Sequence, residues 1–98
     1  MASRWFTVDE LNDMDLPWTA EFTESRGRDK WGENVDLVFR YEWTQYHVLM
    51  HFTPGGDRSY PDAINIEGLW VVDCPEVELY PTRRHVVQFR KVTDEVPL

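Results

Sequence analysis

The alternation of apolar and polar residues is most regular between residues 35 and 52. Apolar side chains occupy the odd positions from Val35 to Trp43 and then the even positions from Tyr46 to Phe52. A period of two is typical of a β-strand with one buried face. One straight strand of this length would span about 60 Å, roughly twice the diameter of a domain of this size. The pattern therefore predicts that the chain turns within this segment.

The change of phase places the predicted turn at Thr44 and Gln45. A two-residue hairpin loop there would bring apolar residues together on one face, pairing Trp43 with Tyr46, Tyr41 with Val48, Phe39 with Met50 and Leu37 with Phe52. Thr-Gln lacks the Gly or Asn that two-residue turns prefer. A β-bulge that bends one long strand is therefore the alternative interpretation.

Shorter alternating segments predict further strands at 18–23, 64–72, 77–79 and 85–92, with an edge strand near 5–8. Polar segments that contain Gly or Pro, at 25–30 and 53–61, are typical of loops between strands. One helical turn is expected near the start, because Thr7 and Glu10 match a capping box. Three apolar residues would share one face of that turn: Val8, Leu11 and Met14.

These elements together predict a mainly β fold, a small antiparallel barrel or sandwich of six to seven short strands with one short N-terminal helical turn. The length of 98 residues favours a single domain over 1–98. Five Trp, five Phe and four Tyr supply apolar area for a core. No segment approaches the run of about 20 apolar residues that spans a membrane.

Charge is the strongest compositional signal, with 18 acidic against 10 basic residues and a net charge of −8. Such a chain as a whole repels nucleic acid and anionic membranes. Two acidic clusters are candidates for binding a protein with a basic surface, with exposed Trp residues as anchors. Their residues are Asp9, Glu10, Asp13 and Asp15 in the first, and Asp73, Glu76 and Glu78 in the second. The alternative is a solvated surface that provides solubility.

A smaller set of basic residues favours a different partner. Two basic groups could form a groove for single-stranded nucleic acid with an aromatic platform: Arg26, Arg28, Lys30 and Trp31 in one segment, and Arg83, Arg84, Arg90 and Lys91 near the C-terminus. The net negative charge opposes this hypothesis. We expect these bases to neutralise neighbouring carboxylates, which makes direct binding of nucleic acid the weaker alternative.

The residues that could carry catalysis or bind metal do not form a convincing set. His47 and His51 would lie about 13 Å apart along a strand, too far to share an ion, and the predicted hairpin places His47 opposite Glu42. Cys74 and His85 are the thiol and a candidate base, but Asp73, Glu76 and Glu78 would raise the pKa of that thiol and make it a poor nucleophile. The sequence therefore predicts no catalytic residues, no metal and no cofactor.

We therefore predict a non-enzymatic acidic interaction protein that binds a basic protein surface, as an inhibitor or accessory of nucleic-acid-handling machinery. One alternative is a small β-barrel that binds a small ligand or single-stranded nucleic acid; another is a structural virion or assembly subunit. The single Cys74 cannot form an intramolecular disulfide, so we expect a cytoplasmic protein. A phage or bacterial source is a hypothesis that no residue tests, and the oligomeric state stays open.

The first testable prediction concerns metal. Because neither the two histidines nor the lone thiol can complete a tetrahedral zinc site on this pattern, the stability of the fold should not depend on a bound ion. Melting temperatures measured by circular dichroism with and without a strong chelator should therefore agree. A drop of many degrees on chelation would contradict this prediction.

Overall fold

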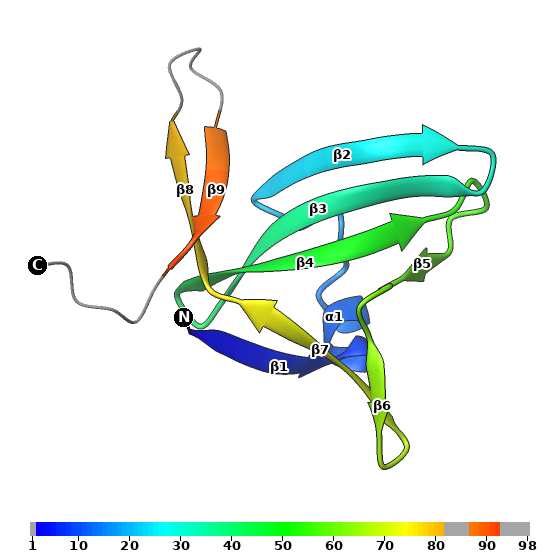
Figure 1. Cartoon of the computed structure of the whole chain (residues 1–98), viewed down its shortest axis with the longest axis horizontal. Helices are drawn as coiled ribbons and strands as arrows, with labels where there is room; N and C mark the ends of the chain where they lie inside the picture. Colours follow the sequence, from blue (N-terminus) through cyan, green and yellow to red (C-terminus); the bar gives the residue numbers. More distant parts are fainter. Residues whose placement is uncertain (1, 82–86, 93–98) are drawn as a thin grey trace, which may run out of the picture.

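The computed structural model describes residues 2–81 and 87–92, which form one short helix and nine strands in three antiparallel sheets (Figure 1). In chain order the elements are β1 (Ser3–Thr7), α1 (Val8–Asp13), β2 (Phe22–Asp29), β3 (Gly32–Tyr41), β4 (Thr44–Phe52), β5 (Arg58–Ser59), β6 (Ile64–Ile66), β7 (Leu69–Pro75), β8 (Val77–Pro81) and β9 (Val87–Lys91). The sheets have the strand orders β1-β7-β6, β2-β3-β4-β5 and β8-β9. The predicted mainly β, antiparallel class is confirmed, with nine strands in the described residues where six to seven were expected. No helix in the described part of the chain is long and apolar enough to cross a membrane.

The hairpin of β3 and β4 confirms the predicted pairing of 35–43 with the residues that follow, but its turn lies elsewhere. The turn residues are Glu42 and Trp43, whose φ values of 49° and 72° are those of a two-residue type I′ turn. Leu37 therefore pairs with Val48 and not with Phe52. The predicted turn at Thr44 and Gln45 is wrong, because apolar Trp43 extended the alternation into the turn itself.

This error in register leaves the buried face unchanged. A shift by an even number of residues keeps every side chain on the same side of a strand, since the side-chain period is two. Phe39 is accordingly buried, with 2% of its surface exposed, whereas Trp43 at the turn is 91% exposed. The hairpin face was thus predicted correctly and its partner residues were not.

The core lies between the inner face of this hairpin and the β1-β7-β6 sheet. The ring of Phe6 on β1 meets Phe39 and Tyr46 edge-on, with centroids 5.2 Å away in both contacts. The helix α1 closes one end of the core with Leu11, and its N-terminus has the predicted capping box between Thr7 and Glu10. Residues from the inner faces of both sheets, from α1 and from two loops form one buried cluster: Phe6, Leu11, Leu16, Val35, Leu37, Phe39, Val48, Met50, Tyr60, Val72 and Cys74.

Three other predicted segments differ from the structure. The strand expected at 18–23 begins only at Phe22, because residues 14–20 form turns. The loop expected at 25–30 belongs largely to β2, which pairs with β3 around a bulge at Arg26. The strand expected over 64–72 is a hairpin of β6 and β7, with its turn at Glu67 and Gly68, both of positive φ. In the first and third of these segments, the alternation of apolar residues continued through residues that form a turn.

Strand β3 is buried on its outer face as well as on its core face. Val38 and Asp36 point outward and are both buried, Asp36 with 8% of its surface exposed. Strand β9 lies over this face, where Phe89 stacks on His47 at 4.7 Å and meets Phe22 edge-on at 5.6 Å. In Figure 1 the β8-β9 hairpin rises from the end of β7 beside this sheet. A carboxylate is thereby held in a partly closed space.

The central position of Phe39 leads to a prediction about stability. Replacing Phe39 with Ala should lower the free energy of unfolding by about 3–5 kcal/mol, because a large buried ring is lost and a cavity remains. Urea unfolding followed by tryptophan fluorescence measures the change. Trp43→Ala is the matched control at the exposed turn of the same hairpin and should change stability by less than about 0.5 kcal/mol. Equal losses in the two variants would contradict the assignment.

Candidate functional site

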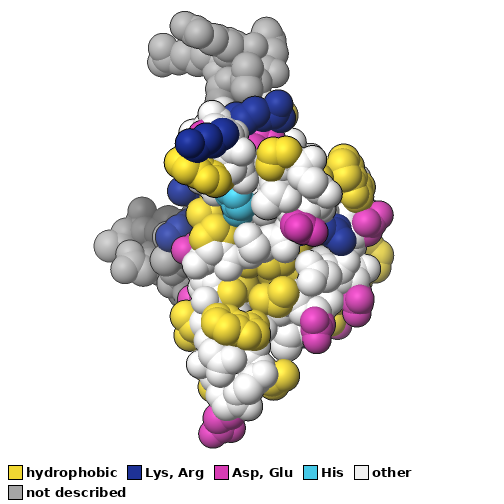
Figure 2. Space-filling model, turned by 90° about the vertical axis from the view of Figure 1, so that its right-hand side faces the viewer, with side chains coloured by type: hydrophobic (Ala, Val, Ile, Leu, Met, Phe, Trp, Pro, Cys, Tyr) yellow, Lys and Arg dark blue, Asp and Glu magenta, His cyan; other side chains and the backbone are white. Residues whose placement is uncertain are grey.

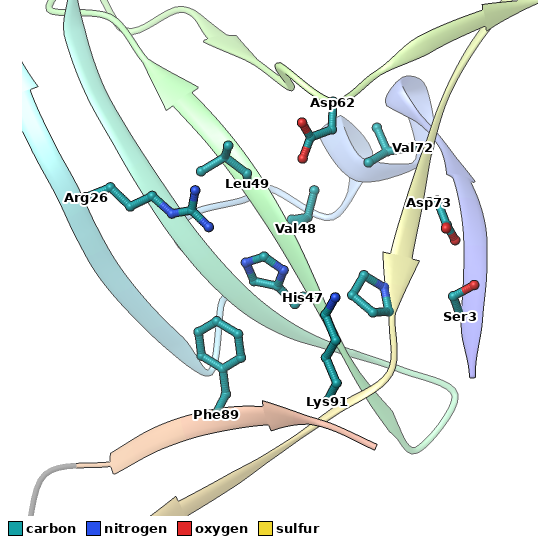
Figure 3. Close-up of a pocket in the computed structure, with 11 residues that line it drawn as sticks. Ser3, Arg26, His47, Val48, Leu49, Asp62, Val72, Asp73, Phe89 and Lys91 are labelled. Carbon is teal, nitrogen blue, oxygen red and sulfur yellow. The ribbon is translucent and has the colours of Figure 1, made fainter. Parts of the chain in front are cut away.

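A cavity of about 570 Å³ lies beside the buried carboxylate, between the outer face of β4, the strand β7 and the hairpin strand β9 (Figure 3). Its volume is in the usual range of roughly 300–1,000 Å³ for small-molecule sites. Three sheets contribute to the wall, which is formed by Ser3, Arg26, His47, Val48, Leu49, Asp62, Val72, Asp73, Pro75, Phe89 and Lys91. The cavity is thus a product of how the sheets pack.

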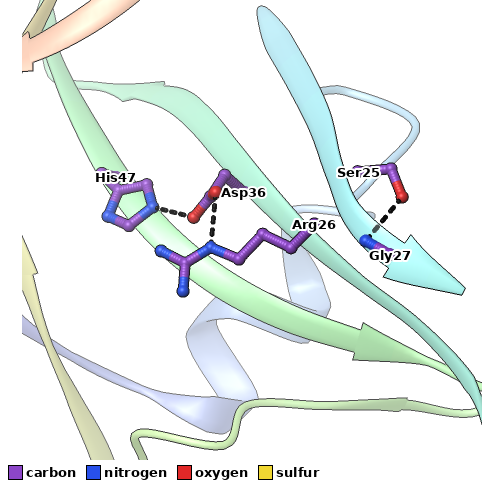
Figure 4. A network of polar contacts seen from close by, with 5 residues as sticks. All are labelled: Ser25, Arg26, Gly27, Asp36 and His47. Atoms are coloured by element: carbon purple, nitrogen blue, oxygen red, sulfur yellow. Dashed lines mark hydrogen bonds and ion pairs between the residues drawn. The ribbon is translucent and has the colours of Figure 1, made fainter.

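An ion network at one side of the cavity joins three neighbouring strands. Asp36 on β3 accepts a hydrogen bond from Arg26 Nε through Oδ2, and its Oδ1 lies 2.7 Å from His47 Nε2 (Figure 4). The Arg26 bond is also 2.7 Å long. The bulge in β2 leaves Arg26 without a paired residue on β3, and the Gly27 N–H donates to Ser25 Oγ beside it. The bulge therefore positions the guanidinium over Asp36.

The network keeps Asp36 ionised in spite of its burial. Burial raises the pKa of this carboxyl, but hydrogen bonds from Arg26 and His47 lower it by more, so the pKa lies below its ordinary value. The same hydrogen bond from Arg26, followed by the charge of Asp36, raises the pKa of the guanidinium. Asp36 is thus a fixed negative charge with two partners.

The remaining charges of the cavity are arranged by sign. Figure 3 shows Arg26 and Lys91 pointing into the cavity from β2 and β9, with the rings of His47 and Phe89 near them. Asp62, from the loop before β6, and Asp73, on β7, line the other side. One wall is therefore cationic and aromatic, and the opposite wall is acidic.

A second surface feature is the outer face of the β1-β7-β6 sheet. Trp5 lies opposite Asp73, and Val71 lies opposite Ile64, so their side chains share one face of the sheet. Ile66 and Leu69 continue the same face. Trp5, Ile64, Ile66 and Leu69 are between 46% and 59% exposed. We call this surface, made of Trp5, Ile64, Ile66, Leu69 and Val71, the apolar face.

The predicted acidic residues are divided between separate parts of the molecule. Those of the first cluster, Asp9, Glu10, Asp13 and Asp15, are exposed on α1 and just after it. Of the second cluster, Asp73 lines the cavity, Glu76 is half-buried in the bridge to Tyr46, and Glu78 pairs with Arg90 across the β8-β9 hairpin. In Figure 1, α1 lies beside β7, away from this hairpin. The chain does not bring the two clusters together as one group.

The predicted basic groove is also divided. Arg26 faces the cavity, while Arg28, two residues along β2, pairs with Glu33 at 3.5 Å beside a different hollow. The Lys30 ammonium lies 4.6 Å from the ring of Trp31 in the β2-β3 turn. Arg83 and Arg84 lie outside the described residues. Arg26 and Lys91 are the two bases of this prediction that the structure brings to one site.

The histidines and the cysteine have separate environments. His47 lies opposite Val38 rather than Glu42, a correction that follows from the shifted turn, and it bonds Asp36; His51 contacts Asn34 at 2.9 Å. Within the described ranges, no three His, Cys, Asp or Glu side chains are grouped as metal ligands would be. Cys74 is buried. Its burial, together with the negative charge of the nearby Asp73, raises the pKa of its thiol to about 12. His85, its predicted base, falls outside the described part of the chain.

Sequence reasoning missed Asp36, the partner of His47, and the role of Phe89 in covering it. A signal existed, because Asp36 stands inside an apolar run from Val35 to Phe39. A charged residue there is normal on the solvent face of a strand, so the pattern by itself indicated exposure.

Comparison of the chain with models of known protein families, with curated proteins and with solved structures finds no match. The site must therefore be interpreted from its own geometry.

The ion network predicts a pH dependence of stability. Because the pKa of Asp36 is lowered in the folded state, its contribution is present above the unfolded value of about 3.9 and is lost as pH falls through the folded value. Asp36→Asn should thus destabilise the fold by about 1.5–3 kcal/mol at pH 7. The difference in the free energy of unfolding between the wild type and Asp36→Asn should become smaller below about pH 4.

Urea unfolding of both proteins at a series of pH values measures this gap. The exposed Asp57→Asn serves as the control and should change stability by less than about 0.5 kcal/mol at neutral pH. A gap between wild type and Asp36→Asn that stays constant into the acid range would refute a charged role for Asp36.

Proposed function

We propose that this protein acts by binding, without catalysis, and that its partner is a protein with a basic surface that docks on the apolar face. The observation that carries the proposal is the exposure of Trp5, Ile64, Ile66 and Leu69 on one face of one sheet. Contiguous apolar side chains at the surface mark interaction sites in soluble proteins. Trp is also among the residues that dominate binding energy at interfaces.

The charges around the apolar face support a basic partner. Asp73 lies directly opposite Trp5, Glu67 lies in the turn between Ile66 and Leu69, and Asp9 borders a hollow of about 160 Å³ with Leu69. Figure 2 shows one side of the molecule, on which hydrophobic side chains extend from the upper to the lower part and acidic side chains lie among and beside them. Lys and Arg gather mainly toward the top, where β8 and β9 stand in Figure 1. An acidic margin around an apolar centre steers a basic partner and fixes its orientation.

The chemistry of the single thiol agrees with a binding role. Burial and Asp73 hold the pKa of Cys74 near 12, so it stays protonated and unreactive at neutral pH. A reduced, buried cysteine also suits the cytoplasm. Basic surfaces are typical of proteins that handle nucleic acid, and an acidic protein that covers one would inhibit or assist that machinery. Assembly with further copies of this chain is less favoured, because each carries a net charge of −8.

The test compares proteins captured from the source lysate by the immobilised wild type and three immobilised variants. Leu69→Asp removes apolar area but keeps the acidic character, Asp9→Lys with Glu67→Lys reverses the charge beside the face, and Trp43→Ser is the control at an exposed Trp outside the face. We expect one basic protein to be retained by the wild type and the Trp43 variant and to be lost with the other two. Size-exclusion chromatography of the wild type checks for self-association.

The captured protein must then be purified and its association rate measured at increasing salt. Charge steering predicts an association rate that falls steeply as the ionic strength rises past about 0.1 M, and about tenfold weaker binding for each face variant. Exposed substitutions should leave stability within about 0.5 kcal/mol of the wild type. An acidic partner, binding that ignores salt, or full binding by Leu69→Asp would refute the proposal, as would a stable homo-oligomer formed through this face.

A further inference from the structure

The cavity beside the Arg26, Asp36 and His47 network has the features of a second binding site, independent of the apolar face. Arg26 donates to Asp36 through Nε, and within the described residues neither of its terminal amino groups donates a hydrogen bond. Figure 4 shows these two groups directed away from Asp36. A guanidinium held in this way presents a planar pair of donors that match a carboxylate or a phosphate.

The position of Arg26 is preset before any ligand arrives. Its Nε bond to the buried carboxylate and the β2 bulge hold the side chain over the cavity. Lys91 enters the same cavity from β9, next to Phe89, whose ring is stacked on His47. An anionic group bound between Arg26 and Lys91 would contact two cations that come from two different sheets. Because the contacting groups are already ordered in the free protein, binding a ligand loses less conformational entropy.

The opposite wall excludes a simple anion as the best ligand. Asp62 and Asp73 both line the cavity, and the negative charge of Asp62 is close enough to contribute to the raised pKa of Arg26. A purely anionic molecule would be repelled by these two carboxylates, and a purely cationic one by Arg26 and Lys91. A molecule with both charges satisfies both walls.

We propose that this cavity binds a small dipolar molecule, one that carries a carboxylate or a phosphate at one end and an ammonium group at the other. The anionic end lies between the Arg26 guanidinium and the Lys91 ammonium. The ammonium end lies between Asp62 and Asp73, and the connecting atoms pass Phe89 and Pro75. The volume of about 570 Å³ leaves room for a ligand with several atoms between its charges.

Three probes with the same number of carbon atoms test this proposal. ε-Aminocaproate carries both charges, caproate carries only the anion and hexylamine carries only the cation. Each is titrated into the isotopically labelled protein, and the shifts of the His47 and Phe89 resonances report both affinity and location. We expect ε-aminocaproate to bind at least about tenfold more tightly than either other probe, since it alone pairs with both walls.

Variants test the contribution of each wall to the binding of ε-aminocaproate, and one variant outside the cavity serves as the control. Arg26→Gln and Asp62→Asn should each weaken ε-aminocaproate binding about tenfold, through opposite ends of the ligand. Arg28→Gln changes the neighbouring arginine of β2, which is absent from the cavity wall, and should bind as the wild type does. Asp62 is an exposed loop residue, so its variant keeps the test valid even where Arg26→Gln fails to fold.

Other outcomes would overturn the proposal. These are equal binding of caproate or hexylamine, unchanged binding by the Asp62 variant, or the absence of shifts at His47 and Phe89 at the highest soluble probe concentration. Leu69→Asp, which alters the apolar face, should leave the titration unchanged. The failure of the docking proposal and the failure of this one are therefore distinguishable.

Discussion

The burial of β3 on both of its faces is the constraint on which the rest of the structure depends. On the inner face, Phe39 joins the rings of β1 and β4 to form the core. On the outer face, Asp36 is buried as a charge, and a buried charge is tolerated only with partners. Arg26 and His47 are those partners, and they come from the strands on either side. The bulge in β2, the cover by β9 and the cavity beside it are all consistent with this one requirement.

The two proposed sites use different parts of the same small molecule. The cavity depends on charges whose positions are held by a buried network, whereas the apolar face depends on the area that the β1-β7-β6 sheet leaves uncovered. Asp73 belongs to both, because it lies opposite Trp5 and also lines the cavity. A partner on the apolar face would therefore approach the acidic wall of the cavity.

Much of the fold followed from local patterns, and the errors share one cause. The alternation over 35–52 identified the buried face of the central hairpin, and Thr7 with Glu10 identified the helix start. One turn was misplaced and another was missed, because an apolar residue at Trp43 and a Gly at Gly68 continued the alternation through them. Turns without a strong Gly or Asn signal are decided by the twist of the paired strands, which one segment does not reveal. Of the site, sequence reasoning selected Arg26 and Lys91 as part of one basic groove, but it assigned Asp73 to a separate acidic cluster.

The sequence by itself determined which side chains of the central hairpin share a face, the capping of α1 and the excess of negative charge, since these depend on neighbours in the chain or on composition. The tertiary structure decided that Asp36 is buried, that Arg26 and His47 meet it, and that β9 covers them. It also decided that Trp5 lies at the surface while Phe6 lies in the core. Those outcomes depend on contacts between segments far apart in the chain, and the energy of each contact exists only after the sheets have packed.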